Sequence, residues 1–155
     1  MKTQRFRSLA ILAIAAAALA ACAYTPTASR EMDSAMKQFP VYSDAATIYV
    51  YRSYLNRADE WSTLYMDGHL VGTTRPGTYF RIDTVPARHV FHGTGVDPGS
   101  IAVKMQAGQI YFLRLDVIAR ESNFRLEPAA VGRKQLLDCC DMIEVWPGGI
   151  WSAQR

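Results

Sequence analysis

The clearest pattern along the chain is a series of short segments rich in β-branched and aromatic residues, separated by turn residues. Residues 46–53 form the first of these, and their composition is typical of strands. In 101–105 and 109–118, apolar positions alternate with polar ones, which is the period of a strand with one buried face. The pattern predicts an all-β fold, an antiparallel β-sandwich of about seven to nine strands, immunoglobulin- or transthyretin-like. Its other strand-like segments are 63–66, 69–73, 77–82, 88–93, 123–131 and 142–146.

Turn residues divide the domain into the short strands that a sandwich requires. Asp67-Gly68 predicts a type I′ hairpin turn, because both residues tolerate the positive φ that this turn needs. Further turns are expected at 83–87, at 96–99 and at 107–108, where glycine or proline interrupts the strand pattern.

Two short helices are also expected. Met32, Met36 and Phe39 are spaced to share one helical face within 30–39, and Pro40 ends that segment. Ser29 is the expected N-cap, with the acidic Glu31 in the first turn. We expect this helix to dock on its own domain. Residues 133–138 predict a further helical turn or two.

The first residues predict an export signal. Lys2, Arg5 and Arg7 precede an apolar run over 9–21, the order found in signal peptides. The run has about 13 residues, fewer than the roughly 20 that span a bilayer. Its end, Leu-Ala-Ala-Cys over 19–22, resembles the lipobox of bacterial lipoproteins. The resemblance implies cleavage between Ala21 and Cys22 and lipid on the Cys22 sulfur. A secretory signal followed by a chance cysteine is the alternative.

The expected organisation follows from this signal. Residues 1–21 are the lipoprotein signal peptide, 22–45 a lipidated tether with a short helix, 46–146 the β-sandwich domain and 147–155 a C-terminal tail. Within the tether, 23–29 has no periodicity and is expected to be a linker. The residue after the lipidated cysteine is Ala23 rather than the aspartate that tends to retain lipoproteins in the inner membrane. This favours the periplasmic face of the outer membrane.

Net charge argues against polyanionic partners. Removing the first 21 of 155 residues leaves 134, and it removes three of the 17 basic residues and none of the 14 acidic ones. The mature side chains therefore carry no net charge. Because nucleic-acid binding depends on clustered positive charge, we expect no nucleic-acid partner and expect membrane contact through the lipid anchor.

Cys139 and Cys140 are adjacent in the chain. Export places them in an oxidising compartment, where thiols tend to pair. One interpretation is a redox pair, acting as a switch or through an intermolecular bridge. The preferred one is two small hydrophobic residues at the end of a short helix, at least one of them buried, because a disulfide between sequence neighbours is uncommon.

With the strands placed, the sequence resembles a known family, domain of unknown function 2846, of small bacterial lipoproteins and secreted proteins. The matching pieces span about residues 45–137, and one departure is 86–89, Pro-Ala-Arg-His, where Pro-Gly-x-His is expected. The hairpin is also similar to PEGA-type β-sandwich modules. Both resemblances imply an envelope β-sandwich of unassigned function, with no catalytic residue. The pieces are Ala-Thr-Ile-Tyr-Val-Tyr-Arg over 46–52, Tyr-Met-Asp-Gly over 65–68, Val71-Gly72, Gly-Thr-Tyr-Phe over 77–80 and Gly-Gln-Ile-Tyr-Phe over 108–112.

A search for catalytic and metal-binding patterns finds no enzyme signature. His89 and His92 are three residues apart on a predicted strand, so their side chains point to opposite faces and do not share a metal. Asp59-Glu60 is expected in a solvated loop, and Asp138 and Asp141 in capping or surface roles. We therefore predict no catalytic residues, no metal, no cofactor and no enzymatic activity.

Three residues are candidate contacts for a ligand or partner: Arg52, Trp61 and Asp67. Arg52 shares a strand face with Ile48 and Val50, which favours a covered, paired arginine. The leading hypothesis is a non-catalytic module that binds an envelope protein. The alternative is a peptidoglycan- or glycan-binding module that uses exposed aromatic residues, although core packing is the default for most of them.

Overall fold

The computed structural model describes residues 25–54, 61–93, 99–118 and 121–146. The lipobox with Cys22, the Asp59-Glu60 pair, most of the 96–99 turn and the tail with Trp151 lie outside these ranges. In the described residues the order is α2 (Arg30–Met36), β1 (Ala46–Arg52), β2 (Ser62–Met66), β3 (His69–Thr74), β4 (Thr78–Thr84), β5 (Arg88–His92), β6 (Ser100–Lys104), β7 (Ile110–Ile118), β8 (Glu121–Glu127), α3 (Ala129–Cys139) and β9 (Asp141–Met142).

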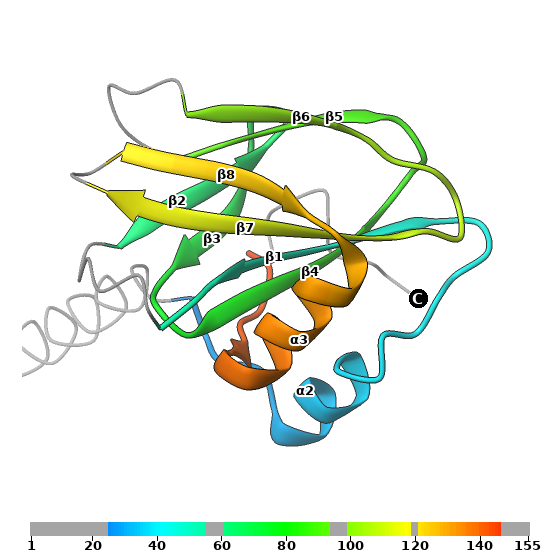
Figure 1. Ribbon diagram of the computed structural model, residues 1–155, viewed down its shortest axis with the longest axis horizontal. Helices are drawn as coiled ribbons and strands as arrows, with labels where there is room; N and C mark the ends of the chain where they lie inside the picture. The colour runs from blue at the N-terminus through cyan, green and yellow to red at the C-terminus, as the bar shows by residue number, and fades with distance from the viewer. Residues whose placement is uncertain (1–24, 55–60, 94–98, 119–120, 147–155) are drawn as a thin grey trace, which may run out of the picture.

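The strands form two sheets, which confirms the predicted β-sandwich. One sheet has the order β8-β7-β1-β4-β9, and the other has the order β3-β2-β5-β6 (Figure 1). The pairing is not purely antiparallel, because β1 lies parallel to β7 and β4 lies parallel to β9. Parallel neighbours need long crossover connections. Here five strands, β2 to β6, lie between β1 and β7 in the sequence. The alternation of apolar and polar residues predicts each strand but not which strand β7 pairs with.

Strand β1 lies at the centre of the larger sheet, and all seven of its residues are buried. Its Ile48 and Val50 belong to the core between the two sheets. Its Tyr49 and Tyr51 belong to a second core on the opposite face, together with Phe39 and residues of α3. Both helices lie on that face (Figure 1). The protein therefore has three layers, two sheets and a partial layer of helices.

Helix α3 begins earlier than the sequence predicts. The segment 123–131 was expected to be one strand, but β8 ends at Glu127 and 129–131 are helical. Pro128 is the N-cap residue, and it has no backbone N–H to donate to a neighbouring strand. Gly132 lets the helix approach β7 closely, because a Cβ at this position would overlap the side chain of Phe112. The last predicted strand, 142–146, is also shorter, since β9 ends at Met142.

Helix α2 has the expected start and a different end. The Ser29 hydroxyl accepts a hydrogen bond from the Met32 backbone N–H at 3.1 Å, which confirms the N-cap. The helix ends at Met36, before the expected stop. Phe39 then adopts a positive φ of 55° and is buried, whereas Met32 is 48% exposed. A turn, rather than the helical face, therefore brings Phe39 into the second core.

The segment before α2 is bound to the domain and is not a free linker. Thr27 forms an antiparallel bridge with Ile143, and the Pro26 carbonyl accepts a hydrogen bond from the Glu144 N–H at 2.9 Å. Thr25 is buried, and its hydroxyl accepts a bond from the Thr73 N–H at 2.9 Å. The short β9 segment therefore extends into contacts with the N-terminal segment.

Candidate functional site

The Asp67-Gly68 turn has the predicted conformation. Its φ angles are 51° at Asp67 and 78° at Gly68, both positive as a type I′ turn requires. Two hydrogen bonds attach the turn to β5, one between backbone groups and one from a backbone N–H to the Asp67 carboxylate. The Asp67 N–H donates to the Val90 carbonyl at 2.8 Å, and the Val90 N–H donates to Asp67 Oδ1 at 2.8 Å.

His89 completes this junction and brings together two of the pieces that resemble the family. Its Nδ1 lies 2.6 Å from Asp67 Oδ2, and its Nε2 lies 2.9 Å from the Val85 carbonyl oxygen. The imidazole is buried, whereas the Asp67 side chain is 33% exposed. Ala87 stands where a glycine was expected, and its φ is not positive, so the turn before β5 does not need glycine. The junction fixes the hairpin on the sheet, a structural role.

The Asp67 carboxyl is held in its charged form. Partial burial alone would raise its pKa, but the hydrogen bonds from His89 and from the Val90 N–H together lower the pKa of Asp67 below its ordinary value. The ionised carboxylate therefore stabilises the folded state. This stability is present above the unfolded pKa of about 3.9 and is lost as pH falls through the lower folded pKa.

Replacing Asp67 with asparagine is expected to lower the free energy of unfolding by about 1 kcal/mol at neutral pH. Asparagine tolerates positive φ, so the turn survives while the charged bond to His89 is lost. Urea unfolding at pH 7 and at pH 3 measures the effect. The difference in unfolding free energy between wild type and Asp67→Asn should be smaller at pH 3 than at pH 7. An equal difference at both pH values would show that the charge of Asp67 does not stabilise the fold.

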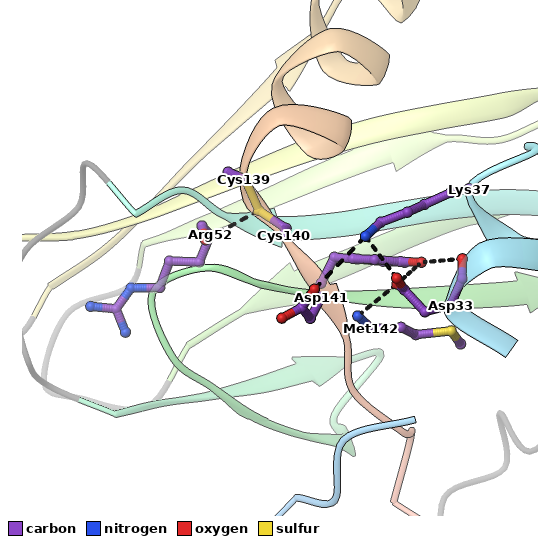
Figure 2. Close-up of polar contacts among 8 residues, drawn as sticks. Asp33, Lys37, Arg52, Cys139, Cys140, Asp141 and Met142 are labelled. Carbon is purple, nitrogen blue, oxygen red and sulfur yellow. Dashed lines mark hydrogen bonds and ion pairs between the residues drawn. A yellow bond between two sulfur atoms is a disulfide. The ribbon is translucent and has the colours of Figure 1, made fainter. Parts of the chain in front are cut away.

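A second junction centres on Asp33 of α2. Its Oδ1 accepts hydrogen bonds from the Tyr79 hydroxyl at 2.9 Å and from the Met142 N–H at 3.0 Å. Its Oδ2 lies 2.7 Å from Lys37 Nζ, and Lys37 also lies 3.8 Å from Asp141 (Figure 2). One carboxylate thus joins the N-terminal helix to β4 and β9. The sequence analysis missed Asp33, because a single acid on an exposed helix gives no signal of such a role.

Cys139 and Cys140 lie at the end of α3, beside this junction, and are joined by a disulfide (Figure 2). Cys140 is buried, as expected, and Cys139 is half-buried. The preferred interpretation as two free hydrophobic thiols did not include this bond. Asp138 pairs with Lys134 on the surface of α3, and Asp141 is exposed, as expected for surface roles.

The candidate contact residues are not gathered in one place. Arg52 is fully buried at the end of β1, which agrees with the covered arginine expected on that face. Trp61 is 56% exposed just before β2, and Tyr54 is 58% exposed just after β1. Asp67 lies at the other end of β2 from Trp61. The structure therefore gives no common site for Arg52, Trp61 and Asp67.

The aromatic residues divide into core and surface sets. His92 stacks on Tyr65 with ring centroids 4.9 Å apart, while His89 faces the interior, so the two histidines point to opposite faces as predicted. Across the described ranges, no group of three or more His, Cys, Asp or Glu residues is arranged to hold a metal ion. Trp146 is half-buried, and its backbone N–H donates to the Val71 carbonyl at 2.8 Å. The buried aromatic residues are Phe39, Tyr49, Tyr51, Tyr79, Phe80, Phe91 and Phe112.

Comparison with protein families identifies a match. The family model described as "Protein of unknown function (DUF2846)" matches residues 42–127, more than half of the chain. The chain belongs to the DUF2846 family. The DUF2846 match begins just before β1 and ends with β8, so it includes both the Asp67–His89 junction and the central strand. It stops before α3 and the cysteine pair. No curated protein and no solved structure matches the chain.

Neither helix in the described part of the chain has the length and apolar character needed to cross a membrane.

Proposed function

We propose that this DUF2846 protein is an envelope lipoprotein, anchored through lipid on Cys22, whose β-sandwich is a non-catalytic module that binds a protein partner close to the membrane surface. The observation that supports this proposal is the attachment of Thr25 to the domain. Its side chain is buried and bonded to β3, only three residues after the cysteine of the lipobox.

The short connection sets the distance between anchor and domain. Three residues of extended chain reach at most about 11 Å. An acylated Cys22 with two or more chains is a durable anchor, so the domain would stay against the lipid surface. A module held at this distance meets partners that lie in or on the same membrane. This favours a protein partner at the membrane over peptidoglycan that lies away from it.

The first test is the lipidation itself. The variant Cys22→Ala should abolish acylation, leave the precursor uncleaved and leave the 17.3 kDa chain intact. Mass spectrometry of the purified protein measures all three. Normal processing and unchanged membrane attachment of the variant would rule out the lipid anchor.

The second test addresses the partner and the short connection. In-cell crosslinking of the lipidated protein, followed by mass spectrometry, should capture one dominant envelope protein. Inserting a flexible segment of about 20 residues between Ala23 and Tyr24 should weaken that crosslink while leaving acylation intact, because the domain is no longer confined to the surface. The control is the same insertion after Arg155. Capture of no specific protein would contradict the partner-binding role.

A glycan-binding module is a second candidate, supported by Tyr54 and Trp61, two aromatic residues that are more than half exposed. Aromatic faces of this kind are suited to stacking on sugar rings. Co-sedimentation with isolated peptidoglycan tests it, using Trp61→Ala and the control Val85→Ala, since Val85 is also exposed but aliphatic. Binding that is lost in Trp61→Ala and kept in Val85→Ala would support this candidate over the first.

A further inference from the structure

The disulfide between Cys139 and Cys140 closes a ring across a single peptide bond, at the point where α3 gives way to β9 (Figure 2). This ring contains the Cα–C bond of Cys139 and the N–Cα bond of Cys140. It therefore restricts ψ of Cys139 and φ of Cys140, the two dihedrals that set the direction of the chain as it leaves the helix. Opening the disulfide releases both dihedrals without removing any side chain.

The residues after the ring form the edge of the larger sheet. The Asp141 N–H donates to the Gly77 carbonyl at 3.0 Å, and the Ile143 N–H donates to the Tyr79 carbonyl at 2.9 Å. Between them, the Met142 N–H donates to Asp33 Oδ1 of α2. The two residues of β9 thus hold the N-terminal helix to the sheet. Their attachment depends on the chain direction that the ring fixes.

Reduction also changes the hydrogen bonding of Cys140. Its Sγ lies 3.6 Å from the Arg52 carbonyl oxygen, which already accepts a bond from the Gly77 N–H at 2.7 Å. The Arg52 guanidinium extends away from this sulfur (Figure 2). A disulfide sulfur has no hydrogen to donate, whereas a thiol does. The reduced Cys140 can therefore bond to the end of β1, and the oxidised one cannot.

We propose that Cys139–Cys140 is a redox-responsive site that accepts two electrons from a protein dithiol of the envelope, and that its oxidation state controls how firmly β9 and α2 are held to the sheet. This proposal goes beyond the binding role. It rests on the envelope location of the proposed function, because its reductant is an envelope dithiol, but not on the binding of a partner.

The exchange reaction balances with a dithiol as the only co-reactant. A thiolate of the reductant attacks Cys139 Sγ, the more accessible sulfur, and the S–S electron pair leaves on Cys140 Sγ, which takes up a proton. The second thiolate of the reductant then attacks the mixed disulfide and releases Cys139 as a thiolate, which is also protonated. The protein gains two electrons and two protons, and the reductant becomes a disulfide.

The position of the pair favours a regulatory role over a catalytic one. Reactive dithiols lie at helix N-termini, where the helix dipole stabilises a thiolate. Cys139 and Cys140 lie at the C-terminal end of α3, where the dipole has the opposite sign. A site of this kind exchanges slowly and keeps the state that its surroundings impose.

Alkylation and hydrogen exchange of the processed protein, purified from membranes, test the proposal. The peptide that contains 139–140 should take up no N-ethylmaleimide before reduction and two molecules after treatment with dithiothreitol. Reduction should speed amide exchange at Asp141, Met142 and Ile143 by at least about tenfold. Exchange at Val117 and Asn123, in the β7–β8 ladder, is the internal control and should not change.

Three results would overturn the proposal. The first is full alkylation of both cysteines without reduction. The second is equal exchange at β9 in the oxidised and reduced protein. The third is a double variant, Cys139→Ser with Cys140→Ser, whose β9 exchanges as slowly as that of the oxidised wild type. Because the wild-type comparison needs no substitution, the test stands even where the double variant does not fold.

Discussion

Replacing Asp83 with alanine is expected to lower the free energy of unfolding by about 3 kcal/mol, because it leaves a buried arginine without its counter-charge and the buried Thr47 hydroxyl without its acceptor. The Arg81 side chain is 2% exposed and its Nη2 lies 3.0 Å from Asp83 Oδ1. Within the described structure, Arg81 Nε already has no hydrogen-bond partner. The guanidinium also lies over the rings of Tyr42 and Tyr49, with its Cζ 4.9 Å and 5.8 Å from their centroids.

The pair Arg114 and Asp116 on β7 is a matched control for this substitution. It has the same two-residue spacing and a distance of 3.0 Å, but the Arg114 side chain is 24% exposed, so water can replace the lost partner. Asp116→Ala should therefore cost under about 1 kcal/mol. Urea unfolding followed by circular dichroism measures both variants. Equal losses would show that burial of Arg81 does not matter.

A double variant tests whether the loss of stability comes from the unpaired charge of Arg81 or from a disturbance of β4. Adding Arg81→Met to Asp83→Ala removes the unpaired buried charge and fills its space with an apolar side chain. We expect the double variant to be more stable than Asp83→Ala alone. A further loss of stability in the double variant would mean that Arg81 stabilises the fold mainly through its other contacts.

The second large effect is expected at alkaline pH, where three tyrosines of the second core resist ionisation. Burial raises the pKa of Tyr49 to about 12 and the pKa of Tyr51 to about 12. Burial, together with the hydrogen bond to Asp33 and its charge, raises the pKa of Tyr79 further. Each hydroxyl has a fixed acceptor in the helical layer: the Met36 carbonyl, the Gln135 side chain and Asp33.

The sign of the effect follows from the raised pKa. In the unfolded chain these tyrosines ionise near pH 10, so stability is complete below pH 10 and is lost as pH rises through the folded pKa. Each resisting tyrosine destabilises the folded state by up to about 1.4 kcal/mol per pH unit in that range. The protein should therefore unfold cooperatively above pH 10, which circular dichroism measures.

Tyr49→Phe tests this explanation because it removes one titrating group and keeps the ring. The loss of stability between pH 7 and pH 11 should be smaller than in wild type by about 1 kcal/mol. Tyr54→Phe, at a 58% exposed position, is the control and should leave that loss unchanged. An equal loss of stability in wild type and Tyr49→Phe would contradict the explanation.

The sequence predicted the strands well because their signals are local. The alternation in β6 and β7 and the Asp-Gly turn each depend on residues that are close together in the chain. The strong β-branched and aromatic character of β1 likewise predicted a strand, and all of its residues are buried.

Other features depend on contacts between distant residues and were not predicted. The parallel pairing of β1 with β7 requires knowledge of which strands meet, and strand composition does not encode it. The same holds for Asp33, whose carboxylate accepts hydrogen bonds from Tyr79 of β4 and Met142 of β9. Pro26 and Ala28 were predicted to lie in a linker because that segment has no periodicity, yet their backbone groups bond to Glu144 and Met142. The disulfide was unexpected because adjacent cysteines are rarely joined.

The position of β1 also determines when the fold can be completed as the chain is synthesised. Its two neighbours are β4, which follows within the same half of the domain, and β7, which follows only after the whole second sheet. The last strand, β9, and residue Ile143 complete the edge beside β4 and fix the N-terminal segment. Contacts between such distant segments make folding slow. A chain synthesised from its N-terminus therefore cannot complete its central sheet until β7, and then β9, have been made.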